Sequence, residues 1–146
     1  MAHQVGKTKG VGFQFGLQKT FPVSEQHAWD FMFSDKGLGI WLGELKTDLG
    51  PKKIYRTKDG VEGLVRVFKP GSHIRMNWKK KYWKNMSTVQ VRVVEKSKNK
   101  TVISLHHEKL TDAKQRSEMK VYWNRKMDKI TNEIDKTPAA NIRHTH

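Results

Sequence analysis

The chain has 146 residues, of which 36% are hydrophobic, enough for one domain with a single core or a core that encloses a cavity. It contains no cysteine, which excludes disulfide bonds, thiolate metal sites and cysteine nucleophiles. Its 29 basic and 14 acidic residues give a formal charge of +15, which favours polyanionic partners such as nucleic acid, an anionic membrane surface or an acidic protein.

The first part of the chain is predicted to form one strand followed by two short helices. Apolar and polar side chains alternate over Val11–Phe21, which indicates a strand. Ser24 is a suitable N-cap for a short helix that runs to Phe33. Asp35–Trp41 predicts a second short helix, which we expect its two glycines to interrupt.

From Gly43 onward the hydrophobic period changes to two, the period of a strand. The turn signals between the alternating runs include Gly50-Pro51, Asp59-Gly60 and Pro70-Gly71. Because short connections join successive runs, we expect an antiparallel meander. The predicted strands are Glu44–Asp48, Lys53–Lys58, Val61–Phe68, His73–Lys80, Ser87–Glu95 and Val102–Glu108.

Three of these strands have one apolar and one polar face. The apolar side chains that share a face are Ile74, Met76 and Trp78, then Val89, Val91 and Val93, then Ile103, Leu105 and His107. The opposite faces carry residues such as Arg75, Asn77, Gln90 and Arg92. One wet and one dry face is typical of an antiparallel sheet that covers a helix.

The segment Asp112–Asp135 predicts the helix that this sheet covers. Its apolar residues recur every three or four positions and form one stripe: Met119, Trp123, Met127, Ile130 and Ile134. Asp112 stands three residues before Gln115, a spacing at which the carboxylate caps the first turn and the amide reaches back. The pattern therefore predicts an α+β fold in which a curved antiparallel sheet wraps around a long C-terminal helix.

We expect a single domain at residues 11–136, between disordered tails at residues 1–10 and 137–146. No apolar run approaches the roughly 20 residues that a membrane-spanning helix needs, and the polar N-terminus lacks the apolar core of a signal peptide. These observations, with the absence of cysteine, lead us to expect a cytoplasmic protein.

The order of predicted elements, over residues 11–135, resembles the helix-grip fold of the START-like (SRPBCC) superfamily. Individual motifs resemble its branch related to the activator of heat-shock-protein-90 ATPase. These are Phe21-Pro22-Val23-Ser24-Glu25, Ala28-Trp29 and Trp41; Gly50, Asp59-Gly60, Gly63, Pro70-Gly71, Ile74 and Trp78; Thr101, Leu105, His107, Leu110-Thr111-Asp112 and Trp123.

The resemblance implies either a ligand-binding or a docking role. Members of this superfamily typically enclose an apolar pocket between helix and sheet and bind lipids, sterols or polyketides; a minority are enzymes, and the eukaryotic activator domain binds a chaperone. Two features depart from the branch: the chain is more basic, and Tyr122 stands where a glycine often precedes the tryptophan. The Tyr122 side chain would narrow a cavity.

The inward faces of the sheet and helix supply the candidate ligand-binding residues. They are Trp41, Met76, Trp78, Val91, Leu105, His107, Met119, Trp123 and Met127. Tryptophan and methionine side chains suit a cavity for varied apolar ligands, because methionine repacks easily. The alternative is that the same side chains fill a closed core.

His107 is the one titratable residue predicted on the dry face of the sheet. It could orient a ligand oxygen or act as an acid or base, or it could be satisfied by a backbone carbonyl or a neighbouring tryptophan. His106 and His107 are adjacent on a strand and point to opposite faces, so they cannot chelate one metal ion together. We expect no metal and no cofactor.

The segment Lys79-Lys80-Lys81-Tyr82-Trp83-Lys84 concentrates cations and aromatic rings in a predicted turn. Its basic patch, Lys79, Lys80, Lys81 and Lys84, suits single-stranded nucleic acid or anionic headgroups. The alternative is a solvated turn whose Trp83 packs back on the sheet.

The sequence as a whole favours non-catalytic binding of a hydrophobic, lipid-like or polyketide-like small molecule between sheet and helix. One alternative is a protein-interaction module that docks its basic surface on an acidic partner such as a chaperone. A cyclase- or hydrolase-like enzyme is the other alternative, with only His107 as an interior acid–base group. The sequence does not define the oligomeric state.

Overall fold

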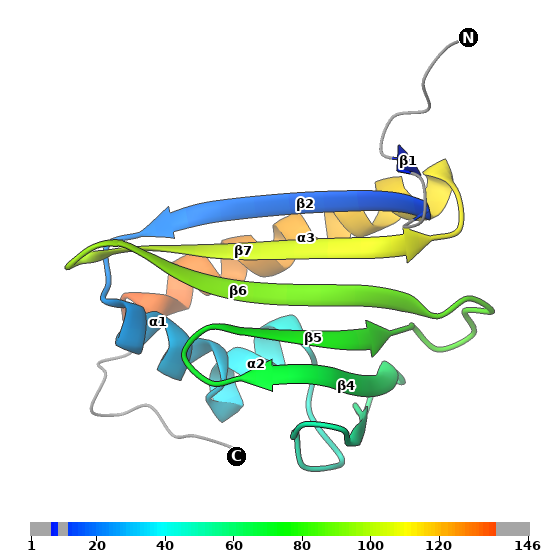
Figure 1. Cartoon of the computed structure of the whole chain (residues 1–146), viewed down its shortest axis with the longest axis horizontal. Helices are drawn as coiled ribbons and strands as arrows, with labels where there is room; N and C mark the ends of the chain where they lie inside the picture. The colour runs from blue at the N-terminus through cyan, green and yellow to red at the C-terminus, as the bar shows by residue number, and fades with distance from the viewer. Residues whose placement is uncertain (1–6, 9–11, 137–146) are drawn as a thin grey trace, which may run out of the picture.

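One antiparallel sheet and one long helix dominate this computed structural model, which describes residues 7–8 and 12–136 (Figure 1). The seven strands lie in the order β1-β2-β7-β6-β5-β4-β3, so β2 pairs with the last strand and the others follow as a meander. Their bounds are β1 Lys7–Thr8, β2 Gly12–Phe21, β3 Ile54–Arg56, β4 Glu62–Lys69, β5 His73–Trp78, β6 Ser87–Ser97 and β7 Lys100–Leu110.

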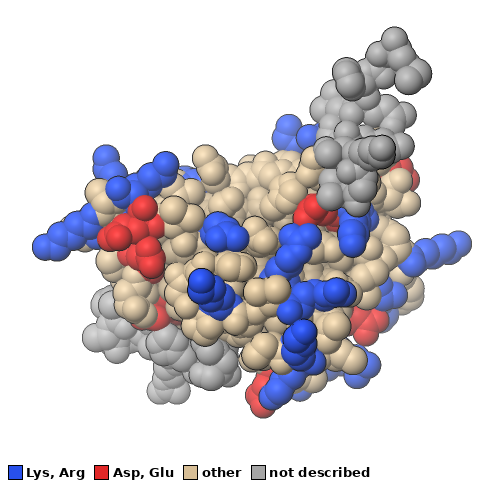
Figure 2. All heavy atoms as spheres, in the orientation of Figure 1, with Lys and Arg blue, Asp and Glu red and all other residues tan. Residues whose placement is uncertain are grey.

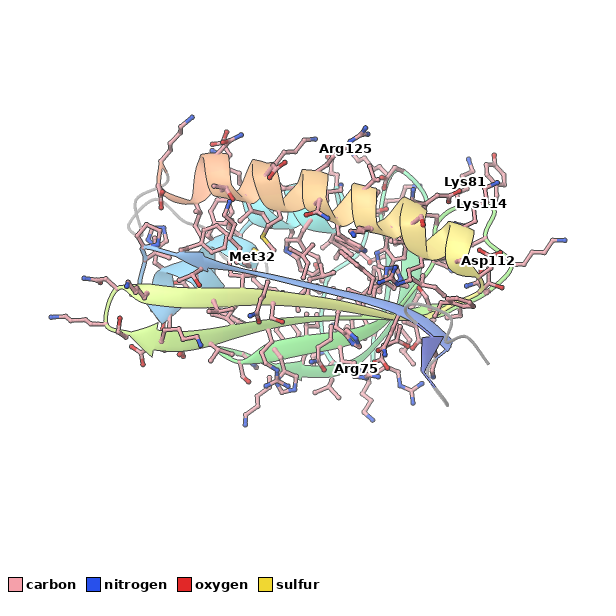
Figure 3. The ribbon with its side chains drawn as sticks, turned by 90° about the horizontal axis from the view of Figure 1, so that it is seen from above. Met32, Arg75, Lys81, Asp112, Lys114 and Arg125 are labelled. Atoms are coloured by element: carbon pink, nitrogen blue, oxygen red, sulfur yellow. The ribbon has the colours of Figure 1, made fainter. Side chains whose placement is uncertain are left out.

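The three helices are α1 Glu25–Met32, α2 Asp35–Trp41 and α3 Ala113–Ile134. Figure 3 shows α3 lying along one face of the sheet, while Arg75 points away from the opposite face. The predicted stripe of α3 is buried: Met119, Trp123, Met127, Ile130 and Ile134. Each such side chain contributes roughly 1.5–3 kcal/mol to folding, so this stripe holds the helix on the sheet. This arrangement is the predicted helix-grip fold.

The first turn of α3 is capped as the sequence predicts, with one difference. The Asp112 carboxylate accepts a hydrogen bond from the backbone N–H of Gln115 at 2.7 Å. The Gln115 side-chain oxygen accepts from the N–H of Thr111 at 2.8 Å, so it reaches one residue further back than expected.

Two rows of side chains, apolar except for His107, cross the inner face of the sheet beneath α3. Strand register places them side by side: Leu17, Leu105, Val91 and Ile74 in one row, and Phe15, His107, Val89 and Met76 in the next. These rows form the floor on which the stripe of α3 rests.

The predicted strand Glu44–Asp48 is wrong. Its backbone meets the sheet at one isolated bridge, Leu45 with Thr57, and leaves it again. Gly43, with φ 123°, brings the segment to the end of β3, where two backbone hydrogen bonds, from Lys46 to Arg56 and from Lys58 to Glu44, make the contact. The strand expected at Lys53–Lys58 is correspondingly shorter, Ile54–Arg56.

Strand β1 lies inside the expected N-terminal tail and pairs with the start of β2. The sequence pattern did not predict it. The rest of that expected tail, and the expected tail at residues 137–146, lie outside the described residues. No helix in the described part of the chain is long and apolar enough to span a membrane.

Helix α2 runs through its two glycines without interruption, contrary to expectation. A Cβ atom on Gly37 would lie 1.8 Å from the carbonyl oxygen of Phe31, whereas one on Gly39 would meet nothing within 4 Å. Gly37 is therefore required because α2 packs directly against the end of α1, and the Ser34 hydroxyl caps α2 at the same place.

Replacing each of these two glycines by alanine distinguishes the effect of close packing on stability from the effect of helix propensity. We expect Gly37→Ala to lower the free energy of unfolding by roughly 1–3 kcal/mol or more, because backbone must move. Gly39→Ala should leave it unchanged or raise it by about 0.5–1 kcal/mol. Denaturant unfolding measures both; equal effects would contradict the tight contact between α1 and α2.

Candidate functional site

Five rings meet between the sheet and the first half of α3. Trp78 ends β5, and its ring centroid lies 5.0 Å from that of His107 on β7 and 5.6 Å from that of Trp123 on α3. The Trp83 ring, from the turn after β5, and the Tyr122 ring lie 5.4 and 5.7 Å from Trp78. We call these five residues the Trp78 cluster.

A chain of hydrogen bonds runs through the Trp78 cluster. The indole N–H of Trp123 donates to Nδ1 of His107 at 2.9 Å. Since Nδ1 accepts, the proton of the neutral imidazole is on Nε2, which lies 2.7 Å from the Ser87 hydroxyl oxygen. The Ser87 hydroxyl in turn donates to the carbonyl oxygen of Trp78.

This environment keeps His107 neutral. Burial, with a smaller effect of neighbouring His106, lowers the pKa of His107 from 6.5 to about 3. Both ring nitrogens are already engaged, one by Trp123 and the other by Ser87. Of the roles that the sequence left open for His107, the structure shows the one in which a neighbouring tryptophan forms a hydrogen bond with the imidazole.

The indole N–H of Trp78 has no hydrogen-bond partner. Among the buried side-chain nitrogen and oxygen atoms of the described residues, it is the one left unsatisfied. It belongs to a ring that is fully buried among the other members of the cluster. A buried N–H that lacks an acceptor costs about 1–3 kcal/mol, so this atom is a donor that remains open to an acceptor oxygen.

All nine predicted ligand-binding residues are buried, none with more than 5% of its surface exposed. Trp78, His107 and Trp123 come together in one cluster. Trp41 belongs to a different group of rings, because it packs edge-on against Phe33. Its indole N–H donates to the carbonyl oxygen of Met32 at 2.7 Å. A surface hollow of about 840 Å³ lies between α2 and residues 43–49, and none of the nine lines it.

Tyr122 and Trp83 cover Trp78, and both are themselves only partly buried. The ammonium groups of Lys80 and Lys126 lie 4.5 and 4.8 Å from the centre of the Tyr122 ring. Burial and then Asp59 raise the pKa of Tyr122 to about 12, so its hydroxyl stays protonated at neutral pH. The Tyr122 ring thus lies edge-on against Trp78 at the surface of the cluster.

The turn after β5 directs Trp83 inward and leaves Tyr82 and two of its lysines exposed. Lys81 and Lys84 are exposed, whereas Lys79 and Lys80 are half-buried. The ring of Trp83 stacks near that of His107, with 6.1 Å between centroids, so Trp83 packs back on the sheet. Trp83 therefore packs as the second interpretation of this turn predicts, and the binding of a polyanion by the lysines stays a prediction.

Sequence reasoning missed two groups that organise the site. Ser87 begins β6 directly opposite Trp78, and it was treated only as the start of a strand. Asn85 and Gln115 exchange two side-chain hydrogen bonds, of 2.9 and 3.1 Å, which tie the turn to the start of α3. Pairing the two strands across the turn would have revealed Ser87, but no sequence signal joins Asn85 to Gln115.

The geometry described above agrees with a comparison between the sequence and known families. Residues 24–135 match the family model described as Activator of Hsp90 ATPase homolog 1-like protein. The chain belongs to this family. Among curated proteins, none matches the sequence.

Solved structures share the fold of this Activator of Hsp90 ATPase homolog 1-like chain at low sequence identity. CalU16 from Micromonospora echinospora is 19% identical with a TM-score of 0.75, over 86% of this chain and 76% of that one. DynU16, from the dynemicin biosynthetic locus, is 10% identical with a TM-score of 0.76, over 88% of this chain and 49% of that one. PFC0360w, an HSP90 activator from Plasmodium falciparum, is 17% identical with a TM-score of 0.70, over 83% and 94%.

These likenesses establish the START-like helix-grip fold for this family member. The chain spans about half the length of the DynU16 chain. At such identities the likeness concerns the fold alone, so the chemistry of the Trp78 cluster has to be argued from this chain's own residues.

The buried imidazole predicts a specific dependence of stability on pH. The folded pKa of about 3 lies below the ordinary value of 6.5, so below about pH 6.5 the unfolded chain binds a proton that the folded chain does not. The low pKa of His107 therefore makes the folded state progressively less stable, relative to the unfolded chain, as the pH falls from 6.5 toward 3, and it has no such effect above pH 6.5.

We expect His107→Gln, which keeps one acceptor and one donor, to remove that effect. Between about pH 6 and 4 the unfolding free energy of wild type should fall more steeply than that of the variant, by up to about 1.4 kcal/mol per pH unit. Denaturant unfolding at several pH values measures both slopes. Parallel slopes would show that His107 is not held neutral.

Proposed function

We propose that this protein binds, without catalysis, a small apolar molecule that carries an oxygen acceptor, in a site between the sheet and α3. The observation that carries the proposal is the unpartnered, buried indole N–H of Trp78. A ligand carbonyl or hydroxyl oxygen at this atom would offset the 1–3 kcal/mol that the unsatisfied N–H costs. Lipid-like and polyketide-like molecules combine such oxygens with large apolar surfaces.

The surrounding side chains suit such a ligand. Trp78, Trp123 and Trp83 offer flat aromatic surfaces, and Met76 and Met119 are unbranched side chains that can repack around different shapes. Apart from the hydrogen-bond chain through His107, the walls are apolar. Affinity would therefore come from burial of apolar surface, and orientation from one hydrogen bond.

Entry of a ligand requires the Tyr122 ring to leave Trp78. Tyr122 is partly exposed, and cation–π contacts with Lys80 and Lys126 hold its ring. Each such cation–π contact stabilises the ring position by about 0.5–1 kcal/mol at exposed sites. Burial of the apolar surface of a ligand can offset the loss of both contacts. Burial, followed by the charge of Lys129, lowers the pKa of Lys126, a sign that this ammonium is itself poorly solvated beside the ring.

A cyclase- or hydrolase-like activity receives less support from the site. His107, the one histidine that is buried among the described residues, has both nitrogens engaged and is neutral at physiological pH. An acid–base group needs a free nitrogen that faces the substrate and a pKa near the working pH. The proposal is therefore restricted to binding.

Benzophenone and diphenylmethane test the proposal because they share a shape and differ in one carbonyl oxygen. We expect benzophenone to raise the melting temperature and to bind at least about five-fold more tightly than diphenylmethane, the value of one hydrogen bond of about 1 kcal/mol. In ¹⁵N NMR spectra the indole resonance of Trp78 should shift with benzophenone alone.

Two variants serve as controls for this experiment. Trp78→Phe should abolish the preference for the ketone while keeping an aromatic wall, and Tyr122→Ala should strengthen the binding of both compounds by making room. If neither compound binds even to Tyr122→Ala, the interior is a closed core and the proposed function is wrong.

A second candidate function is docking on an acidic protein. Figure 2 shows that basic side chains outnumber acidic ones across the outward face of the sheet. On that face Glu108 is already paired with Arg75 at 2.8 Å. The fold likeness to an HSP90 activator covers 94% of that activator chain, which supports a role of the same kind.

Polyglutamate provides a direct test of this second candidate. We expect the protein to bind immobilised polyglutamate at low ionic strength and to lose most of that affinity at about 0.15 M salt, where charges more than about 8 Å apart are screened. Binding that is absent, or that is insensitive to salt, would contradict docking through charge.

A further inference from the structure

A second hollow lies at the corner of the sheet, and Trp78 is not among the residues that line it. It has a volume of about 400 Å³ and lies between the β3–β4 hairpin and the turn after β5. We call it the corner hollow. It is lined by Lys46, Arg56, Thr57, Lys58, Asp59, Gly60, Val61, Glu62, Lys79, Lys81 and Tyr82.

Two cations of the corner hollow have no acidic partner in the fold. Glu62 pairs with Arg56 at 3.4 Å and with Lys79 at 4.0 Å, and Lys58 pairs with Glu44. Within the described residues, no carboxylate lies at ion-pair distance from Lys46 or Lys81. These two ammonium groups are available to a ligand that carries negative charge.

Tyr82 stands beside these cations with almost its whole side chain in water. Its exposed fraction is 87%, the largest among the exposed hydrophobic side chains, and the Lys81 ammonium lies 5.2 Å from the centre of its ring. Its backbone has φ 74°, a left-handed conformation that a bulky residue rarely adopts. Strain of this kind, about 1–3 kcal/mol, persists only where the surrounding structure enforces it.

The neighbouring residues enforce this conformation. Trp83 is anchored on Trp78, and its carbonyl oxygen accepts from the Lys79 ammonium at 3.1 Å. On the other side, a Cβ atom on Gly60 would lie 2.7 Å from Cβ of Lys81, so the turn and the hairpin touch where only glycine fits. The fold thus holds the Tyr82 ring and the Lys81 ammonium side by side at the surface.

We infer that the corner hollow is the docking site for an acidic peptide segment of a partner protein. Carboxylates of the segment pair with Lys46 and Lys81, and an apolar side chain of the segment lies against the Tyr82 ring. Tyrosine is a frequent anchor at interfaces because it brings a large contact area with few rotatable bonds. This inference rests on the second candidate function and specifies where and by what chemistry docking occurs.

An acidic peptide fits the hollow better than a nucleic acid strand. Proteins that bind single-stranded nucleic acid without sequence preference stack successive bases on several aromatic rings. In this turn Trp83 points inward, so Tyr82 is the one ring of the turn that is exposed. Asp59 and Glu62 also line the hollow, and they would repel an uninterrupted row of phosphates. A peptide alternates its carboxylates with neutral groups, and its backbone N–H groups can donate to these two side chains.

The test is the affinity of a fluorescein-labelled peptide in which Glu and Leu alternate, measured by anisotropy at low salt. We expect Tyr82→Gly and Lys81→Gln each to weaken binding by roughly five- to tenfold. Tyr82→Gly also relieves the positive φ, so its melting temperature should not fall. Lys98→Gln removes the same charge from the β6–β7 turn at the other end of the sheet and should change affinity by less than about twofold.

The outcomes distinguish a failure of the corner hollow as the site from a failure of docking as the function. If the wild-type protein binds neither this peptide nor polyglutamate, the second candidate function and this site both fail. If wild type binds but the three variants bind equally well, docking is diffuse and the corner hollow is not the site. If single-stranded oligothymidylate binds more tightly than the peptide and loses affinity in Tyr82→Gly, the occupant is nucleic acid and the inference is overturned.

Discussion

Burial of the apolar stripe of α3 against the inner face of the sheet is the constraint on which the rest of the structure depends. The stripe runs from Met119 to Ile134, and two rows of side chains from β2, β5, β6 and β7 meet it. The meander, the capped start of α3 and the close packing of α1 on α2 all serve to keep that contact dry. The chain's large positive charge stays outside it (Figure 2).

One group of buried polar side chains within this interface is ordered by hydrogen bonds. Trp123, His107 and Ser87 form a chain that ends on the backbone of Trp78 and leaves the indole N–H of Trp78 without an acceptor. In the proposed function, the same arrangement keeps His107 neutral and provides one polar contact for a ligand. The proposed binding inside and the proposed docking outside would involve different groups, because the corner hollow is lined by Tyr82 and Lys81 on the outer side of the same turn.

The periodicity of the sequence predicted the stripe of α3, the meander and the burial of all nine candidate ligand-binding residues. Alternation could not distinguish a strand from a loop at Glu44–Asp48, because a segment that makes a single bridge to the sheet can show the same pattern. Neither could it predict ring orientations. Contacts between segments that are distant in sequence fix these orientations. Lys80 of the turn lies over the Tyr122 ring of α3, and the hydrogen bonds between Asn85 and Gln115 tie the turn that carries Trp83 to the start of α3.

The central claim is that a neutral imidazole, held by Trp123 and Ser87, lies at the heart of the interface between sheet and helix. The ¹⁵N chemical shifts of the His107 ring at neutral pH test it most directly, because they report which nitrogen carries the proton. The hydrogen-bond chain predicts a protonated Nε2 and an unprotonated Nδ1, unchanged on mild acidification. A charged ring, or a proton on Nδ1, would contradict the account.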